Sequence, residues 1–228
     1  MTIDLTLIGT QHMDLKGPRR LRKALERLNP DVVSVEYDEQ RAGIADQMTE
    51  KLKSEIFFET VFEGYLCMFP DAHEETLRQY IRSTDFEYRV AKKYSQERGI
   101  LLDLHDTLDA HANAVDAMQE GTEKNKTFER LFALNPMQHA KRVREFYDAI
   151  EEGELTAEEI EGFAARDAET AKHIKELQGK VVRISGIVHT HAKYRNLYEH
   201  CAVLSPRRMK LCEVDSPNFG RPYTPSKP

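Results

Sequence analysis

The residues best suited to chemistry are two histidines that each follow a glycine by three positions. Gly9-Thr10-Gln11-His12 and Gly186-Ile187-Val188-His189 share this Gly-x-x-His spacing, and both follow a β-rich run. One copy would carry no weight in a chain with 11 glycines and 9 histidines, but two copies at strand exits are more informative. Glycine allows a sharp turn or a positive φ as the backbone leaves a strand. The histidine can then point back over the strand end as a metal ligand or general base, or merely cap loop carbonyls.

A carboxylate occupies the corresponding place after a second strand-like run. Glu36 directly follows Val32-Val33-Ser34-Val35, where a carboxylate is costly unless it is paired. It is therefore expected to be a metal ligand or base at the rim of the sheet, or the ion-pair partner of Arg41. Both alternatives remain open from the sequence.

Three further residues are candidates for a supporting role around the site. Asp103 ends the run Ile100–Asp103, and His105 lies two residues beyond it. His191 lies two residues after His189. Asp103 and His105 are weaker candidates, because the run Leu101-Leu102-Asp103 is also compatible with a strand that ends in solvent.

Two histidines and a carboxylate match an open catalytic metal site with room for water. His12, Glu36 and His189 would be the ligands, and ligand sets of this kind suit Zn, Mn or Co. In a metal-free alternative, a histidine acts as general base on water that Glu36 orients. No H-E-x-x-H, P-loop, G-x-G-x-x-G or G-x-S-x-G motif is present, which excludes the common zincin, nucleotide-binding and serine-hydrolase classes.

Alternating strand and helix patterns predict an α/β fold. We expect a mostly parallel sheet of four to five strands, with flanking helices, right-handed crossovers and large helical insertions. Ligands in such sheets collect beyond the carboxyl ends of the strands, so the candidate residues should meet at one edge. The β-rich runs lie at 3–8, 32–35, 100–103, 180–185 and 210–214, and the helical patterns at 18–28, 44–68, 73–98 and 126–178.

The domain organisation follows from the same patterns. Residues 1–214 are expected to form a single α/β domain with helical insertions at about 42–99 and 107–178, followed by an extended Pro-rich tail at 215–228. Thr156 with Glu159 three positions later is typical of a capping box, and Gly179 is typical of the residue that ends a helix.

Composition narrows the classes of function. The 228 residues include 33 Lys and Arg against 39 Asp and Glu, a net charge of −6, which argues against a general nucleic-acid binder. No apolar run approaches the roughly 20 residues of a membrane span, and the N-terminus lacks the pattern of a signal peptide. A cytoplasmic protein is therefore expected. The six basic residues between Lys16 and Arg27 favour a solvated helix face, with an anionic partner as the alternative.

The remaining cysteines and histidines are assigned to structural or surface positions. The three cysteines lack the spacing of a disulfide framework and are expected to be buried or inert thiols, with Cys67 in a helix core. Five histidines in charged helical segments are expected at the surface: His73, His111, His139, His173 and His200.

Two stretches of the chain resemble the TraB/PrgY family, which is related to the Tiki and GumN proteins and, more remotely, to the erythromycin-esterase/ChaN-like group. The first runs from Leu7-Ile8-Gly9-Thr10-Gln11-His12 to Asn29-Pro30-Asp31-Val32-Val33-Ser34-Val35-Glu36 and Arg41. The second joins Arg166-Asp167 to Gly186-Ile187-Val188-His189. The match covers about the first 41 residues and residues 160–192.

This resemblance implies a parallel α/β core with the candidate residues at one end. Because Tiki members are regarded as metal-dependent proteases, it implies metal-binding or water-activating roles for His12, Glu36 and His189. Arg41 and Arg166 would clamp an oxyanion or substrate carboxylate, or orient Glu36. The chain departs from many relatives in lacking transmembrane segments and in placing Leu104, rather than arginine, after Asp103.

The leading functional hypothesis is a metal-dependent hydrolase of a peptide or another amide or ester. A divalent ion would activate water, and Arg166 or Arg41 would steady the oxyanion. The partners would be a peptide or small-molecule substrate, with a homo-oligomer possible, and neither nucleic acid nor membrane. The alternatives are a metal-free histidine-based esterase, a regulatory protein that sequesters a small ligand, haem or peptide, and a structural module.

Overall fold

A parallel sheet lies at the centre of the molecule. The computed structural model describes residues 3–107, 123–150, 157–193 and 195–216. The sheet has five strands in the order β3-β2-β4-β1-β5, and each pair of neighbours is parallel. This confirms the predicted α/β fold class. The strands are β1 (Ile3–Thr10), β2 (Val32–Val35), β3 (Leu101–Leu104), β4 (Gly179–Gly186) and β5 (Arg207–Lys210).

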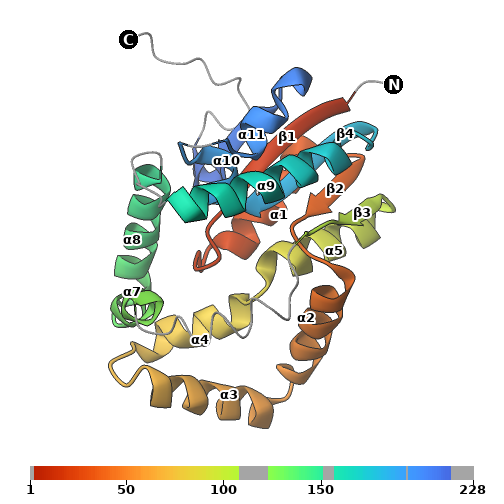
Figure 1. Cartoon of the computed structure of the whole chain (residues 1–228). Coiled ribbons are helices and arrows are strands. Elements are labelled where there is room, and N and C mark those ends of the chain that lie inside the picture. The colour runs from red at the N-terminus through yellow and green to blue at the C-terminus, as the bar shows by residue number, and fades with distance from the viewer. Residues whose placement is uncertain (1–2, 108–122, 151–156, 194, 217–228) are drawn as a thin grey trace.

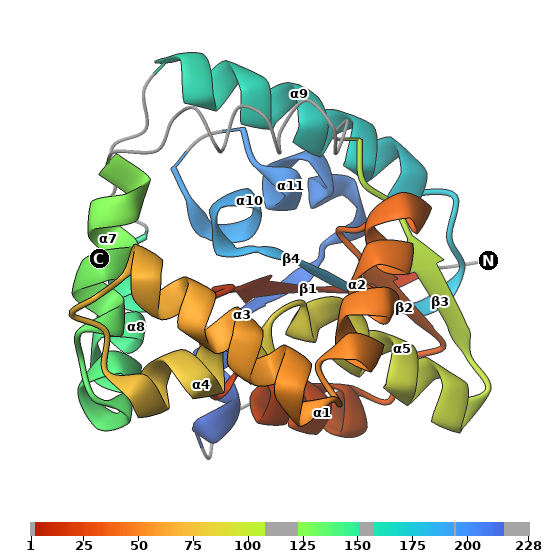
Figure 2. The same ribbon diagram turned by 90° about the horizontal axis from the view of Figure 1, so that it is seen from below.

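Helices cover both faces of the sheet (Figure 2). On one face lie α9 (Ala157–Ile174), α10 (Ile187–His191) and α11 (Leu197–His200), and on the other lie α1 (Gly17–Leu28) and α5 (Phe86–Arg98). Successive strand residues point to opposite faces, which explains the two layers of core. The first layer contains Leu5, Leu7, Val181, Ile174 and Leu197, and the second contains Ile8, Val182, Leu21, Leu25 and Tyr94.

The other helices form an arc that extends from the sheet (Figure 1). They are α2 (Glu39–Lys51), α3 (Glu55–Met68), α4 (Glu74–Ser83), α7 (Glu123–Phe132) and α8 (Pro136–Ala149). The long helical stretches of the sequence are thus divided by breaks at polar N-cap residues. The side chains of Asp38, Ser54 and Asn135 each accept hydrogen bonds from backbone N–H groups in the first turn of the helix that follows.

Two sequence predictions are wrong, one about the position of the fifth strand and one about the end of α9. The fifth strand is Arg207–Lys210 rather than 210–214, and Leu211–Asp215 forms a 3₁₀ helix, after the short 3₁₀ helix Ala202–Leu204. Gly179 does not end α9, which stops at Ile174; it begins β4 with a φ of +81°. Thr156 and the side chain of Glu159 lie outside the described residues, so the capping box stays a prediction.

Several surface assignments are corrected by the packing. Cys201 and Cys212 are buried, and burial raises the pKa of each thiol to about 11, but Cys67 is exposed on α3. The predicted solvated face of α1 includes a buried residue, Arg20, whose guanidinium pairs with Asp14 at 2.6 Å and with Asp215 at 2.7 Å. Within the described parts of the chain, none of the helices has both the length and the apolar character that a bilayer crossing needs.

His139 on α8 is completely buried rather than at the surface, and neither ring nitrogen has a hydrogen-bond partner among the described residues. Burial lowers its pKa to about 4, below the 6.5 of an exposed histidine. The unfolded chain therefore binds this proton first as pH falls, and folding stability is lost between about pH 6.5 and pH 4.

We expect His139→Leu to remove this loss. Between pH 7.5 and pH 5 the wild-type protein should lose about 2 kcal/mol more unfolding free energy than the variant. Urea unfolding at the two pH values measures the difference. His73→Leu, at an exposed residue before α4, is the control and should behave like the wild type. Equal pH dependence of His139→Leu and wild type would contradict the prediction.

Candidate active site

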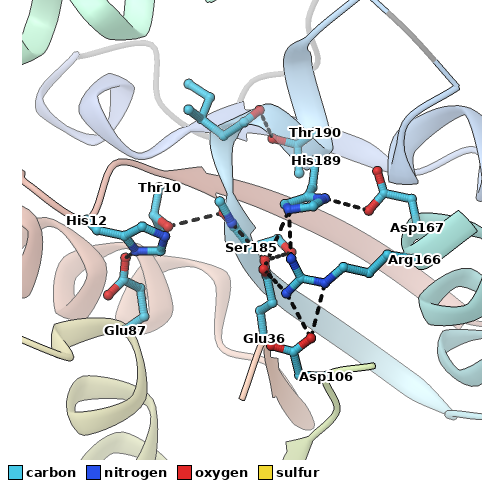
Figure 3. Close-up of polar contacts among 12 residues, drawn as sticks. Thr10, His12, Glu36, Glu87, Asp106, Arg166, Asp167, Ser185, His189 and Thr190 are labelled. Carbon is cyan, nitrogen blue, oxygen red and sulfur yellow. Dashed lines mark hydrogen bonds and ion pairs between the residues drawn. The ribbon is translucent and has the colours of Figure 1, made fainter. Parts of the chain in front are cut away.

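Strand register brings the candidate residues to one edge of the sheet. Thr10 of β1 lies opposite Gly186 of β4, and Val35 of β2 lies opposite Ile184. The segments that carry His12, Glu36 and His189 therefore leave the sheet side by side. Figure 3 shows Glu36, Arg166 and His189 gathered on one side of this edge, with His12 and Glu87 on the other.

Close approach requires a glycine at Gly9 but not at Gly186, and neither of these glycines has a positive φ. Gly9 lies inside β1, where a Cβ atom would come 2.5 Å from Thr190 Oγ1 of α10. A Cβ on Gly186 would lie 3.5 Å from His189 Cδ2 and 3.8 Å from His12 Nε2. Both imidazoles thus face the same small space above Gly186, which places the two rings close together as the sequence suggested.

Glu36 is held as a carboxylate by donors from three directions. Its Oε2 accepts from Ser185 Oγ at 2.6 Å and from the Gly186 backbone N–H at 3.0 Å, and its Oε1 accepts from Arg166 Nη2. Burial alone would raise the pKa of Glu36. The positive charges of His189 when protonated, Arg166 and Arg183 outweigh burial and hold the pKa well below its ordinary value.

His189 is oriented by a buried carboxylate on α9. Its Nδ1 lies 2.8 Å from Asp167 Oδ1, and both side chains are almost fully buried. Its Nε2 lies 3.3 Å from Arg166 Nη1, and a guanidinium can only donate hydrogen bonds. In the neutral ring the proton therefore sits on Nδ1, facing Asp167, and Nε2 carries the lone pair. This is the tautomer that a general base requires. When the ring is protonated, its Nε2–H faces Glu36 Oε1 at 3.5 Å.

His12 belongs to a second histidine–carboxylate pair. Its Nδ1 lies 2.7 Å from Oε1 of Glu87, a buried residue of α5. The Glu87 carboxylate raises the pKa of His12, Glu36 adds to the effect, and Arg41 opposes it. Because the His12 side chain is 68% exposed, solvent screens part of this rise. Asp167–His189 and Glu87–His12 thus face each other across Gly186.

The two arginines share one buried acceptor. Arg41 Nη1 donates to Asp106 Oδ2 at 2.5 Å, and Arg166 donates to Asp106 Oδ1 from Nη2 at 2.8 Å and from Nε at 3.1 Å. Arg41 reaches only the backbone oxygen of Glu36, at 3.5 Å, so the proposed Glu36–Arg41 ion pair is replaced by Arg166–Glu36. Arg166 therefore joins the site directly, and Arg41 supports it from behind.

Arg183 lies beneath the site with its side chain completely inside the sheet. Nη1 donates to Ser34 Oγ and to the Val35 carbonyl, each at 3.0 Å, and Nη2 donates to the His105 carbonyl at 2.9 Å. It links the ends of β2 and β3 and places a positive charge under Glu36. Arg183 was not identified as a candidate from the sequence, because it lies within a run that predicts a buried core strand.

The remaining predicted residues support the edge of the sheet from outside the reactive space. Asp103 accepts from Ser34 Oγ at 2.6 Å and pairs with His173 Nε2 at 2.8 Å. The His105 ring stacks on His173 with centroids 3.9 Å apart, which ties the end of α9 to the segment after β3. His191 is buried and contacts Thr190 Oγ1, and burial together with Arg208 and Lys210 lowers its pKa to about 3.

The predicted metal ligands do not form a ligand set. Glu36 is already bonded to Ser185, Gly186 and Arg166, and the Arg166 guanidinium contacts both Glu36 and His189 Nε2, where a shared ion would have to sit. Among the described residues, no group of three or more histidine, cysteine or acidic side chains is arranged to hold a metal ion. The geometry therefore favours the metal-free alternative, and metal binding stays a prediction.

Solvent reaches the site from the side of His12. The side chains of Glu36, Arg166 and His189 are 15%, 11% and 7% exposed, against 68% for His12. A hollow of about 680 Å³ lies elsewhere, between α9 and the segment around α11. No protein-family model, curated protein or solved structure matches the chain.

Proposed function

We propose that this protein hydrolyses an ester or amide bond without a metal, with His189 as general base and His12 as general acid. The observation that carries the proposal is the pair of histidine–carboxylate contacts that face each other across Gly186. Environments that separate the protonation behaviour of two groups identify the acid and the base. Glu87 favours protonated His12, whereas the Arg166 contact requires a lone pair on His189 Nε2.

The reaction follows from these positions. Water displaces Arg166 Nη1 from the lone pair of His189 Nε2, which takes a proton from this water, and the water oxygen attacks the carbonyl carbon of the substrate. The carbonyl oxygen becomes an oxyanion, to which the second N–H of Arg166 Nη1 donates. When the tetrahedral intermediate collapses, His12 Nε2 gives its proton to the leaving alcohol or amine. The products are a carboxylic acid and that alcohol or amine. His189 then releases its proton to solvent, and exposed His12 regains one from solvent.

Glu36 acts through Arg166 in this scheme. Three donors fix its carboxylate, and it fixes the Arg166 guanidinium together with Asp106. A guanidinium held by two carboxylates keeps its position while charge develops on the substrate, so little reorganisation is needed at the moment of reaction. The role of Glu36 is to position Arg166 rather than to bind a metal.

The test is hydrolysis of an activated neutral ester, 4-nitrophenyl butanoate, by the full chain. We expect His189→Gln to lower kcat/KM by at least about 10²-fold, since a glutamine amide cannot accept the proton from water. His12→Gln should lower it less for this substrate, because 4-nitrophenolate leaves without protonation. His73→Gln, at an exposed residue before α4 and away from the reactive space, is the matched control and should retain activity.

The same assay separates the metal-free scheme from its competitors. Activity should be unchanged by EDTA and by added Mn²⁺, Co²⁺ or Zn²⁺. Loss with EDTA and recovery with one of these ions would replace the scheme with the metal-dependent one. If His189→Gln is as active as the wild type, or if esters and peptides are not hydrolysed at all, the proposal fails and a sequestering role takes its place.

A further inference from the structure

The positive side chains that contact the candidate site are each neutralised by a carboxylate. Arg41 pairs with Asp106, and Arg166 pairs with Asp106 and Glu36. His12, the most exposed of these groups, pairs with Glu87. An incoming anion would therefore find Arg41, Arg166 and His12 already bonded to acidic partners.

A fourth cation, beneath the strand ends, cannot contact a ligand. Arg183 is completely buried, and its guanidinium donates to Ser34 Oγ and to two backbone carbonyls beneath the strand ends. Its charge supports the ionised state of Glu36 from below. The chain as a whole carries a net charge of −6, so the surrounding field also opposes the approach of anions.

Paired charges of this kind discriminate by repulsion as well as by attraction. A negative group that enters the site loses its water and comes close to the carboxylates of Glu36 and Glu87, which already neutralise the nearby charges of Arg166 and His12. A neutral group incurs no such cost, and a cation gains from the same carboxylates. This argues against phosphate esters and against acyl groups that carry a carboxylate or sulfonate.

We infer that the natural substrate carries no negative charge next to the scissile bond and is a neutral or cationic ester or amide. This inference rests on the proposed function, since it names the substrate class of the same site. It predicts an order of reactivity, cationic or neutral acyl group before anionic acyl group, that hydrolysis by itself does not require.

Three 4-nitrophenyl esters of matched shape test the inference. They are the 5,5-dimethylhexanoate, which is neutral, its isostere 4-(trimethylammonio)butanoate, which is cationic, and 4-sulfobutanoate, which is anionic. Their charges are permanent, so the comparison does not depend on pH. We expect kcat/KM for the sulfonate to be lower by about tenfold or more than for the neutral ester, and the cationic ester to match or exceed the neutral one.

Salt and one variant identify the cause of the discrimination. Raising NaCl to about 0.5 M should narrow the differences, because salt screens charges at an accessible site. Glu87→Gln should lower the ratio of cationic to neutral reactivity. A sulfonate ester that reacts as fast as the neutral ester overturns the inference while leaving the proposed function intact. Absence of His189-dependent hydrolysis of the neutral ester overturns both.

Discussion

Arg183→Met should destabilise the protein by about 3–5 kcal/mol, the usual cost of removing one partner from a buried charged network. The substitution leaves Ser34 Oγ and the carbonyls of Val35 and His105 without their donor. It also removes a positive charge from beneath Glu36. Methionine fills much of the same volume, so the loss reports on charge and hydrogen bonds rather than on a cavity. Urea unfolding at pH 7.5 measures it.

A matched surface arginine isolates the effect of burial. Arg207 on β5 pairs with Asp4 at 2.9 Å, but the two side chains are 39% and 59% exposed. Arg207→Met should therefore cost less than about 1 kcal/mol. Arg183→Lys keeps the charge but cannot bridge both strand ends, and it should lie between the two. If Arg183→Met unfolds within about 1 kcal/mol of the wild type, the arginine does not hold β2 and β3 together.

The site residues that could be predicted from the sequence are those that directly follow the strands. Gly-x-x-His after β1 and β4, and Glu36 after β2, were located because strand ends in a parallel sheet share one edge. Local signals of this kind need no knowledge of how distant helices pack. The expected resemblance to the TraB/PrgY family, for which the comparisons found no match, suggested Arg166 as well, and the structure places it against Glu36 and His189.

The partners that decide the chemistry come from helices, and the sequence does not say which helical carboxylate meets which histidine. Glu87 and Asp167 lie in charged segments with many other acidic residues, and only the packing of α5 and α9 selects them. Arg183 sits in a run that reads as an ordinary buried strand. Two histidines and a glutamate suggest a metal ligand set, but the structure places the guanidinium of Arg166 against Glu36 and His189.

Helix boundaries show the same division between local and tertiary information. Helix α8 begins after a local cap at Asn135, with Pro136 in the first turn and the Gln138 side chain accepting from the Asn135 N–H, within a stretch predicted from the sequence as one helical pattern. The position of Gly179 at the start of β4 could not be predicted from the sequence. Its positive φ accompanies the approach of β4 to Asp31, whose Oδ2 accepts from the Lys180 N–H at 2.8 Å. A glycine after a helical run is typical of a helix end. Here the glycine instead allows Asp31 to approach, since a Cβ on Gly179 would lie 2.8 Å from Asp31 Oδ2.

Asp167→Asn should lower kcat/KM by about 10²–10⁴-fold while leaving the fold intact, because it reverses the tautomer of His189. An asparagine can direct its amide N–H toward Nδ1, which must then accept, so the ring proton moves to Nε2. That proton would face Arg166 Nη1, a donor, at 3.3 Å. Nε2 could no longer take a proton from water, and His189 would be lost as a base although its ring remains in place.

The measurement needs a readout that a purely structural role would not change. ¹⁵N chemical shifts of the imidazole should show the proton on Nδ1 in the wild type and on Nε2 in Asp167→Asn. Glu169→Gln is the control on the same helix, since Glu169 is exposed and pairs only with Lys172 among the described residues, so it should leave both activity and tautomer unchanged. An Asp167→Asn protein that keeps its activity and its Nδ1 proton would show that Asp167 only fills space beside His189. The loss of activity together with a shifted proton would instead tie catalysis to the lone pair on Nε2, which is the one feature that the metal-dependent and metal-free schemes use differently.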